Sequence, residues 1–199
     1  KAAWKKDTPI AALVFYRALF QAGNLKVIDA LIEGLSRAGL NALPVFVASL
    51  KDPVAAATLE GLLVDAPPGV VLNATGFAVS VPGGKHKPSP FEAAGQKGQP
   101  GPVVLQVVFS GGNEPDWRQG KSGLGPRDIT MNVALPEVDG RVFTRAVSFK
   151  GLKRRDPLCE TDVVEYEPVQ DRIDFVCEMA ANWAGLGLKP AKDRRIAII

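Results

Sequence analysis

Apolar runs of strand length alternate with amphipathic stretches of helix length along the first part of this chain. Residues 9–16, 43–48 and 69–72 are continuous apolar runs, which are typical of strands buried on both faces of a parallel sheet. Between them, residues 24–39 and 52–63 carry leucine and isoleucine at helical spacing. This alternation predicts a doubly wound, mainly parallel sheet with helices on both faces and right-handed crossovers. We therefore expect a flavodoxin-like α/β fold.

Capping residues mark the ends of the predicted helices. Asn24 is expected to cap the first helix and Gly39 to end it, because asparagine accepts bonds from free amides and glycine readily adopts positive φ. Asp52 and Pro53 suit the N-cap and the first turn of the second helix.

Two further strands and a long helix are predicted in the second half of the chain. Residues 103–109 form the most hydrophobic run, and residues 142–149 alternate apolar with polar side chains. Beyond Gly151 a polar link precedes Pro168, which opens a helix with one apolar stripe. The stripe, in which Trp183 is expected to belong to the core, consists of Val169, Ile173, Val176, Ala180 and Trp183.

These elements predict one α/β domain over residues 1–151. Residues 152–199 are interpreted as a linker, the long helix and the start of the next element of a larger chain. The closing run at residues 194–199 is typical of the opening of a buried strand, and the chain begins with Lys1. We therefore expect an internal piece of a longer protein.

Polar side chains follow three of the predicted strands at the point where each strand ends. Arg17, Ser49, Asn73 and Thr75 all occupy such positions. In open α/β sheets, ligands bind beside the carboxyl ends of the strands, near the point where the strand order reverses. This rim is a candidate binding site, although every α/β domain has one. Gln106, in the middle of an apolar strand, must find a buried hydrogen-bond partner.

A stiff turn at residues 136–140, Pro-Glu-Val-Asp-Gly, places two carboxylates two residues apart. Glu137 and Asp139 are the candidate catalytic residues, and Arg141 and Arg145 follow them directly. Loops held between buried elements often carry the chemistry of a protein. The alternative is an Asp-Gly turn whose glutamate is merely solvated.

Composition excludes several classes of function. The net charge is only +3, and the densest basic cluster, residues 153–155, is followed at once by Asp156, so nucleic-acid binding is not indicated. Cys159 and Cys177 lie 18 residues apart without metal-ligand spacing, which favours reduced thiols and a cytoplasmic protein. No apolar run reaches the roughly 18 residues that a membrane span needs.

Nucleotide and hydrolase motifs are absent. The Gly-Lys-Ser sequence that begins at Gly120 lacks the glycine five residues earlier, where the chain has Pro115. The stretch at residues 123–128 ends in Asp128, which is too large for the dinucleotide fingerprint. His86 lies between lysines in a Gly- and Pro-rich segment, so a metal-ligand role is not favoured.

Several segments in order resemble the family of large subunits shared by cobaltochelatase and magnesium chelatase, and within it the aerobic cobaltochelatase branch. The longest is Leu-Pro-Glu-Val-Asp-Gly-Arg-Val-Phe-Thr-Arg-Ala-Val-Ser-Phe-Lys at residues 135–150. The other segments are Leu-Val-Phe-Tyr-Arg (13–17), Ala-Gly-Asn (22–24), Val-Ile-Asp-Ala-Leu-Ile-Glu (27–33), Gly-Leu-Asn-Ala-Leu-Pro-Val-Phe-Val-Ala-Ser-Leu-Lys-Asp (39–52), Asn-Ala-Thr-Gly-Phe (73–77), Val-Leu-Gln-Val-Val (104–108) and Arg-Arg-Ile-Ala-Ile-Ile (194–199). The segment at residues 80–101 departs from the family pattern.

The resemblance implies a fragment of a much longer subunit that binds a metal-free corrin, hydrogenobyrinic acid a,c-diamide, and receives Co²⁺ as the substrate metal. It implies that ATP is hydrolysed by two partner subunits, an AAA+ ATPase and its companion, and is not bound here. The alternatives are the magnesium chelatase branch, which inserts Mg²⁺ into protoporphyrin, and a non-catalytic ligand-binding or scaffolding module that docks the ATPase near residues 153–155.

Metal insertion requires removal of inner-nitrogen protons, partial desolvation of the metal and a fixed macrocycle. Glu137 is the first candidate for the base or metal ligand, with Asp139 supporting it or building the turn.

Arg17 and Arg145, and less strongly Arg141, are candidates for binding the peripheral carboxylates of the substrate. Asn73 and Thr75 are candidates for orienting polar edges of the substrate, whereas Gln106 is a candidate for either that role or a structural bridge.

Overall fold

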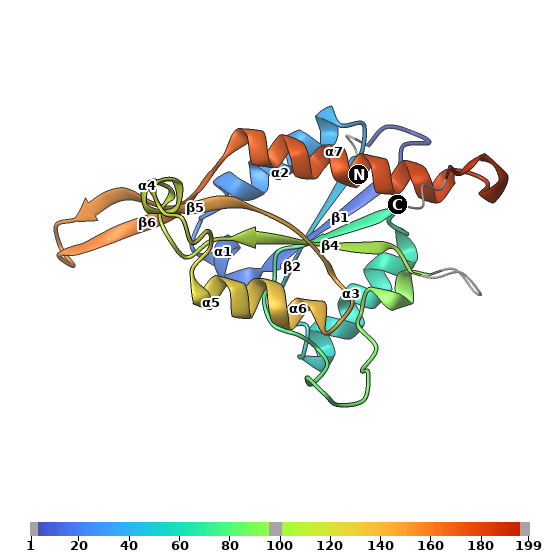
Figure 1. Ribbon diagram of the computed structural model, residues 1–199, viewed down its shortest axis with the longest axis horizontal. Coiled ribbons are helices and arrows are strands. Elements are labelled where there is room, and N and C mark those ends of the chain that lie inside the picture. The colour runs from blue at the N-terminus through green and yellow to red at the C-terminus, as the bar shows by residue number, and fades with distance from the viewer. Residues whose placement is uncertain (1–3, 96–100, 196–199) are drawn as a thin grey trace.

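The computed structural model describes residues 4–95 and 101–195 and shows a six-stranded sheet of order β2-β1-β3-β4-β5-β6 (Figure 1). The strands are β1 (Ile10–Tyr16), β2 (Asn41–Val47), β3 (Val70–Asn73), β4 (Val103–Phe109), β5 (Val142–Asp156) and β6 (Thr161–Pro168). Strands β1 to β5 are parallel to one another, and β6 pairs antiparallel with β5. The order of the five parallel strands is that of the flavodoxin-like fold. The predicted fold class is therefore confirmed.

Helices cover both faces of this sheet. Helices α2 (Lys26–Arg37) and α7 (Gln170–Leu188) lie together on one face, and α3 (Pro53–Asp65), α5 (Pro126–Ile129) and α6 (Leu135–Glu137) lie on the other (Figure 1). A π-helical segment, Thr130–Ala134, joins α5 to α6. The remaining helical elements are α1 (Arg17–Gln21), α4 (Glu114–Gln119) and short turns at Glu92–Ala94 and Ala191–Asp193.

The central strand β1 shows why both faces need a cover. Leu13 and Phe15 pack in the core beneath α2 and α7, whereas Ala12 and Val14 pack in a second core beneath α3. Successive side chains of a strand point to opposite faces, so a strand without polar positions is stable only with apolar neighbours on both sides.

One of the two predicted N-caps is confirmed, and Gly39, with a φ of 80°, follows the end of α2 as predicted. Asp52 accepts a hydrogen bond from the amide of Ala55 at 2.7 Å, with Pro53 in the first turn. The prediction for Asn24 is wrong, because α2 begins after Leu25 without a side-chain cap. The Oδ1 atom of Asn24 accepts instead from the amide of Tyr166 at 3.0 Å, and so ties the start of α2 to β6.

The predicted polar link after Gly151 is a β-hairpin. β5 continues to Asp156 and returns as β6, so the predicted domain boundary falls inside a strand. Helix α7 then packs on α2 and buries Ile173, Val176 and Ala180 in the same core as the strands. The expectation that Trp183 is a core residue is wrong, because 37% of it is exposed. The predicted strand opening at residues 194–199 falls largely on 196–199, which lie outside the described residues.

The contact between α2 and α7 depends on Gly34. A Cβ atom at this position would lie 2.7 Å from Sγ of Cys177, a distance that real Cβ atoms do not tolerate. Gly61 in α3 is a matched helical glycine, because a Cβ there would meet nothing within 4 Å.

We expect Gly34→Ala to lower the free energy of unfolding by about 1–3 kcal/mol through overpacking. The same change at Gly61 is expected to raise it by up to about 1 kcal/mol, because alanine has the higher helix propensity. Urea denaturation followed by circular dichroism measures both. Equal effects of the two substitutions would contradict the close α2–α7 packing.

Candidate active site

A cavity of about 690 Å³ lies at the carboxyl ends of the strands, where the strand order reverses between β1 and β3. From β1 the chain crosses to β2 on one side, and from β3 it crosses to β4 on the other, so no connection fills the space between them. The cavity is lined by Tyr16, Arg17, Ala18, Leu19, Gln21, Ala48, Ala74, Gly76, Phe77, Phe109, Gly111, Gly125, Pro126, Arg127, Asp128, Met131, Asn132, Lys150 and Tyr166.

Three exposed cations stand at this cavity. Arg17 begins α1 directly after β1, Arg127 lies in the first turn of α5, and Lys150 lies in β5 beyond the last core residue. Asp128 is the one carboxylate among the lining residues, and it is buried. Its oxygens accept bonds from the hydroxyl of Ser110 at 2.7 Å and the amide of Gly111 at 3.0 Å. The cavity therefore offers cationic side chains to a ligand that carries negative charge.

Aromatic side chains form the apolar part of the lining. These are Tyr16, Phe77, Phe109 and Tyr166. Burial raises the pKa of the Tyr16 phenol, and burial together with the charge of Asp128 raises that of Tyr166, so both hydroxyls stay protonated at neutral pH. The Tyr16 hydroxyl donates to the carbonyl of Gly76 at 3.2 Å, which leaves its ring as an apolar wall.

A buried hydrogen-bond network supports the segment that follows β3. The Nδ2 atom of Asn73 donates to Oε1 of Gln106 at 2.9 Å and to the carbonyl of Thr75 at 3.0 Å. The hydroxyl of Thr75 donates to Oδ1 of Asn73 at 2.9 Å, and Nε2 of Gln106 donates to the Thr75 carbonyl at 2.9 Å. Asn73 and Gln106 are cross-strand partners in the sheet, which places their amides side by side. The network holds the chain in place beneath the cavity.

The turn before β5 joins this network through a buried ion pair. The guanidinium of Arg141 donates to Oδ2 of Asp139 at 2.8 Å, and the two side chains are 1% and 0% exposed. The carboxylate of Asp139 also accepts from the amides of Val79 and Ser80, at 2.6 and 2.9 Å. Burial lowers the pKa of Arg141, and the charge of Asp139 opposes that shift. Gly140 has a φ of 70°, as the predicted Asp-Gly turn requires.

The π-helical segment contributes Met131 and Asn132 to the lining of the cavity. The amide of Leu135 donates to the carbonyl of Thr130, five residues earlier. The next such bond, to the carbonyl of Met131, cannot form because residue 136 is proline and has no N–H. The carbonyl of Met131 accepts instead from the amide of Phe77 at 2.8 Å. π-helical turns occur often at functional sites.

The structure brings only some of the predicted site residues to the cavity. Arg17 lines it, whereas Asn73 and Thr75 lie buried beneath it, and so does the predicted bridge Gln106. Asp139 is committed to the bonds just described. Glu137 ends α6 as an exposed residue that does not line the cavity.

The other predicted arginines also lie away from the cavity. The guanidinium of Arg145 stacks on the ring of Phe175 at 3.5 Å, over α7. Arg141 lies in the buried network. Sequence reasoning did not find Arg127, Lys150 and Phe77. Lys150 and Phe77 each end one of the segments that carry the family resemblance, which was the available signal.

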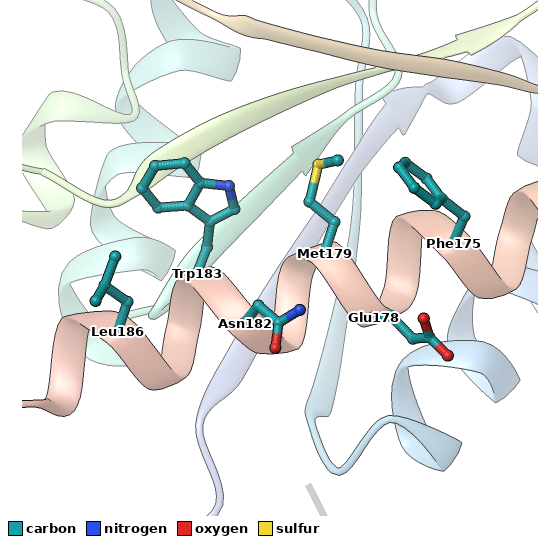
Figure 2. Close-up of a pocket in the computed structure, with 6 residues that line it drawn as sticks. All are labelled: Phe175, Glu178, Met179, Asn182, Trp183 and Leu186. Carbon is teal, nitrogen blue, oxygen red and sulfur yellow. The ribbon is translucent and has the colours of Figure 1, made fainter. Parts of the chain in front are cut away.

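A smaller groove of about 280 Å³ runs along α7 (Figure 2). All of its lining residues come from this one helix, and Figure 2 shows Phe175, Met179, Trp183 and Leu186 in a row along one side of it. They are Phe175, Glu178, Met179, Asn182, Trp183 and Leu186. The groove lacks polar groups that converge from several elements, so the larger cavity is the better candidate site.

The described part of the chain shows neither a cluster of metal-binding side chains nor a membrane-spanning helix. Over residues 4–95 and 101–195, no three His, Cys, Asp or Glu side chains gather closely enough to hold a metal ion. His86 is exposed, and its Nε2 atom lies 3.1 Å from the Glu92 carboxylate. No helix in these ranges is both long and apolar enough to span a membrane.

Comparison with known proteins identifies the family. The family model described as CobN/Magnesium Chelatase matches residues 1–199, the whole chain. The chain belongs to this family. It is 46% identical over 193 residues to the aerobic cobaltochelatase subunit CobN of a Sinorhizobium species, and 42% identical over 199 residues to that of Pseudomonas aeruginosa. These alignments cover 97% and 100% of this chain, but 15% of each relative.

More distant members extend the comparison. A magnesium-chelatase subunit from Cereibacter sphaeroides is 28% identical over 200 residues, which is 94% of this chain and 16% of that protein. Among solved structures, the catalytic subunit of cobaltochelatase from Mycobacterium tuberculosis matches with a TM-score of 0.73 and 26% identity. That match covers 91% of this chain and 15% of the other. The suspected family membership is confirmed, and the chain spans about a seventh of the length of its relatives.

The Asp139–Arg141 pair gives the first test of the site's construction. We expect Asp139→Asn to lower the free energy of unfolding by about 3 kcal/mol, because it leaves a buried guanidinium without its countercharge. Glu137→Gln is the matched control two residues away, and we expect it to change stability by less than about 0.5 kcal/mol, because Glu137 is exposed. Denaturant titration of both variants measures the difference. Similar stabilities would show that the buried pair does not hold the turn.

Proposed function

We propose that this chain is part of the tetrapyrrole-binding subunit of an ATP-dependent chelatase that inserts Co²⁺ into hydrogenobyrinic acid a,c-diamide during cobalamin biosynthesis. The cavity at the switch point carries the proposal, because it combines three cations with an aromatic lining. A corrin carries peripheral carboxylates around a conjugated ring, so it needs both kinds of contact. Family membership supports the same substrate class.

The cobalt branch is favoured over the magnesium branch. The identity to the two CobN subunits exceeds the identity to the magnesium-chelatase subunit by 14 percentage points or more, since 42% is compared with 28%. Both branches handle a tetrapyrrole with acidic side chains, so the cavity chemistry alone does not choose between them. Mg²⁺ insertion into protoporphyrin remains the alternative that a metal-specific assay would reveal.

In this proposal, the residues of the cavity bind and orient the macrocycle. Arg17, Arg127 and Lys150 neutralise the carboxylates at its edge, and Tyr16 and Phe77 contact the ring system. The buried network of Asn73, Thr75 and Gln106 holds the chain beneath the cavity in place before the ligand binds. Binding therefore costs little conformational entropy in this part of the protein. Co²⁺ enters as substrate. Hydrolysis of ATP is assigned to an AAA+ partner subunit and its companion, and the complex is assigned to the cytoplasm.

We retain Glu137 as the candidate proton acceptor or metal ligand, but for a site completed by parts of the subunit outside this chain. The carboxylate lies outside the cavity, and among the described residues its side chain has no hydrogen-bond or ion-pair partner. An exposed, unpaired carboxylate keeps both of its oxygens available for a hydrated cation.

Arg17 provides the test of corrin binding. We expect Arg17→Gln in the intact subunit to weaken corrin binding about tenfold, because one charge-assisted contact is lost, and the loss should shrink as salt is added. Absorbance titration with the metal-free corrin measures the dissociation constant. Arg37→Gln is the control, since Arg37 is an exposed arginine that pairs with Asp174 on α7, away from the cavity.

If the Arg17→Gln variant, the control and the unchanged subunit bind the corrin with equal affinity, the cavity is not the corrin-binding site. The chain would then be better explained as a scaffolding module.

Glu137 is tested through the insertion step. We expect Glu137→Gln to slow Co²⁺ insertion about a hundredfold while the corrin dissociation constant stays within about twofold, because a general base contributes to the step and not to binding. Insertion is followed by the absorbance change of the macrocycle in the complete complex with ATP. An unchanged insertion rate would leave Glu137 with only a role in the turn.

A further inference from the structure

Phe77 adopts a backbone conformation that aromatic residues rarely take. Its φ is 65°, in the left-handed region, and the residue is 45% exposed at the wall of the cavity. For a bulky side chain a positive φ is strained, and exposure of an aromatic ring to water adds no compensation. Strain of this kind persists where the surrounding structure imposes it, and it is concentrated at functional sites.

Three contacts impose this conformation. The amide of Phe77 donates to the carbonyl of Met131 at 2.8 Å, which is the carbonyl that the π-helical segment leaves free before Pro136. The preceding residue, Gly76, is so close to the π-helical segment that a Cβ would lie 2.9 Å from Oδ1 of Asn132. The carbonyl of Gly76 accepts from the hydroxyl of Tyr16. The segment is therefore fixed from both sides of the cavity.

These constraints hold the ring of Phe77 at the cavity and away from the core. Asn73 at the end of β3 and Thr75 just after it are satisfied by one another and by Gln106, so the fold beneath does not need the Phe77 ring. A relaxed conformation would require the loss of at least one of the three contacts. The fold thus gives up stability to present an aromatic surface to a ligand.

We propose that Phe77 is a stacking platform that contacts the face of the tetrapyrrole and positions the ring while the cations hold its edge. This proposal rests on the proposed function. A phenyl ring against a conjugated macrocycle gains from burial and from the geometry of the aromatic contact. Its contribution is apolar and so depends little on salt, unlike that of Arg17.

The test uses the intact subunit and absorbance titration with the metal-free corrin. We expect Phe77→Leu, which keeps apolar bulk without a ring, to weaken binding about tenfold at low and at high salt alike. Phe77→Tyr keeps the ring and is expected to bind within about twofold of the unchanged subunit. The shift of the macrocycle absorption band is expected to diminish with leucine and to persist with tyrosine.

Phe77→Asn separates a functional role from a structural one. Asparagine accepts positive φ more readily than phenylalanine, so we expect this variant to keep or raise the melting temperature while binding weakens at least as much as with leucine. If the Phe77 ring had only a structural role, the asparagine variant would have a lower melting temperature and unchanged corrin binding. Either that pattern or wild-type affinity of the leucine variant overturns the proposal.

The failure of this proposal is distinguishable from that of the proposed function. If the unchanged subunit does not bind the corrin, the proposed function itself fails. If Arg17→Gln weakens binding and Phe77→Leu does not, the cavity binds the corrin but Phe77 is not its platform.

Discussion

The cavity depends on the buried ion pair between Asp139 and Arg141. Removing two charges from water costs several kcal/mol for each ion, and attraction offsets this only when the remaining hydrogen-bonding capacity is also used. The structure meets that condition for the carboxylate, because the amides of Val79 and Ser80 take up its oxygens. The Asp139 carboxylate thus connects the turn before β5 to the early part of the segment that follows β3.

The position of this pair beside three neighbouring strands lets Arg141 approach further buried polar groups. β3, β4 and β5 are neighbours, so Asn73, Gln106 and Arg141 come from three successive strands or strand starts. The guanidinium approaches Oε1 of Gln106 at 3.4 Å and the carbonyl of Thr75 at 3.5 Å. A glutamine in the most hydrophobic strand is explained by this arrangement, since it satisfies polar groups that would otherwise be buried alone.

Patterns that depend on local spacing made the fold predictable. The start of each of the five parallel strands was located to within two residues, although β5 runs seven residues beyond its predicted end. Arg17 was found because residues after strand ends share one edge of a parallel sheet. Contacts between distant segments were not predictable in the same way. The two amides that donate to Asp139 lie 60 and 59 residues earlier in the chain, so the spacing of Glu137 and Asp139 did not reveal that one side chain is buried and the other exposed. Arg127 reaches the cavity because the next residue, Asp128, is bonded by Ser110 and Gly111, which follow β4.

Pro136 illustrates how one residue connects these levels. Its missing N–H is a defect within the helix, because the carbonyl of Met131 loses its intrahelical partner. In the folded chain that carbonyl is the acceptor that fixes Phe77, some 54 residues away in sequence. A regular α-helix here would use its carbonyls internally and leave the amide of Phe77 without this acceptor. The irregular helix and the strained loop therefore depend on each other. The carbonyl of Met131, which the helix leaves without an intrahelical partner, is the acceptor that the amide of Phe77 requires.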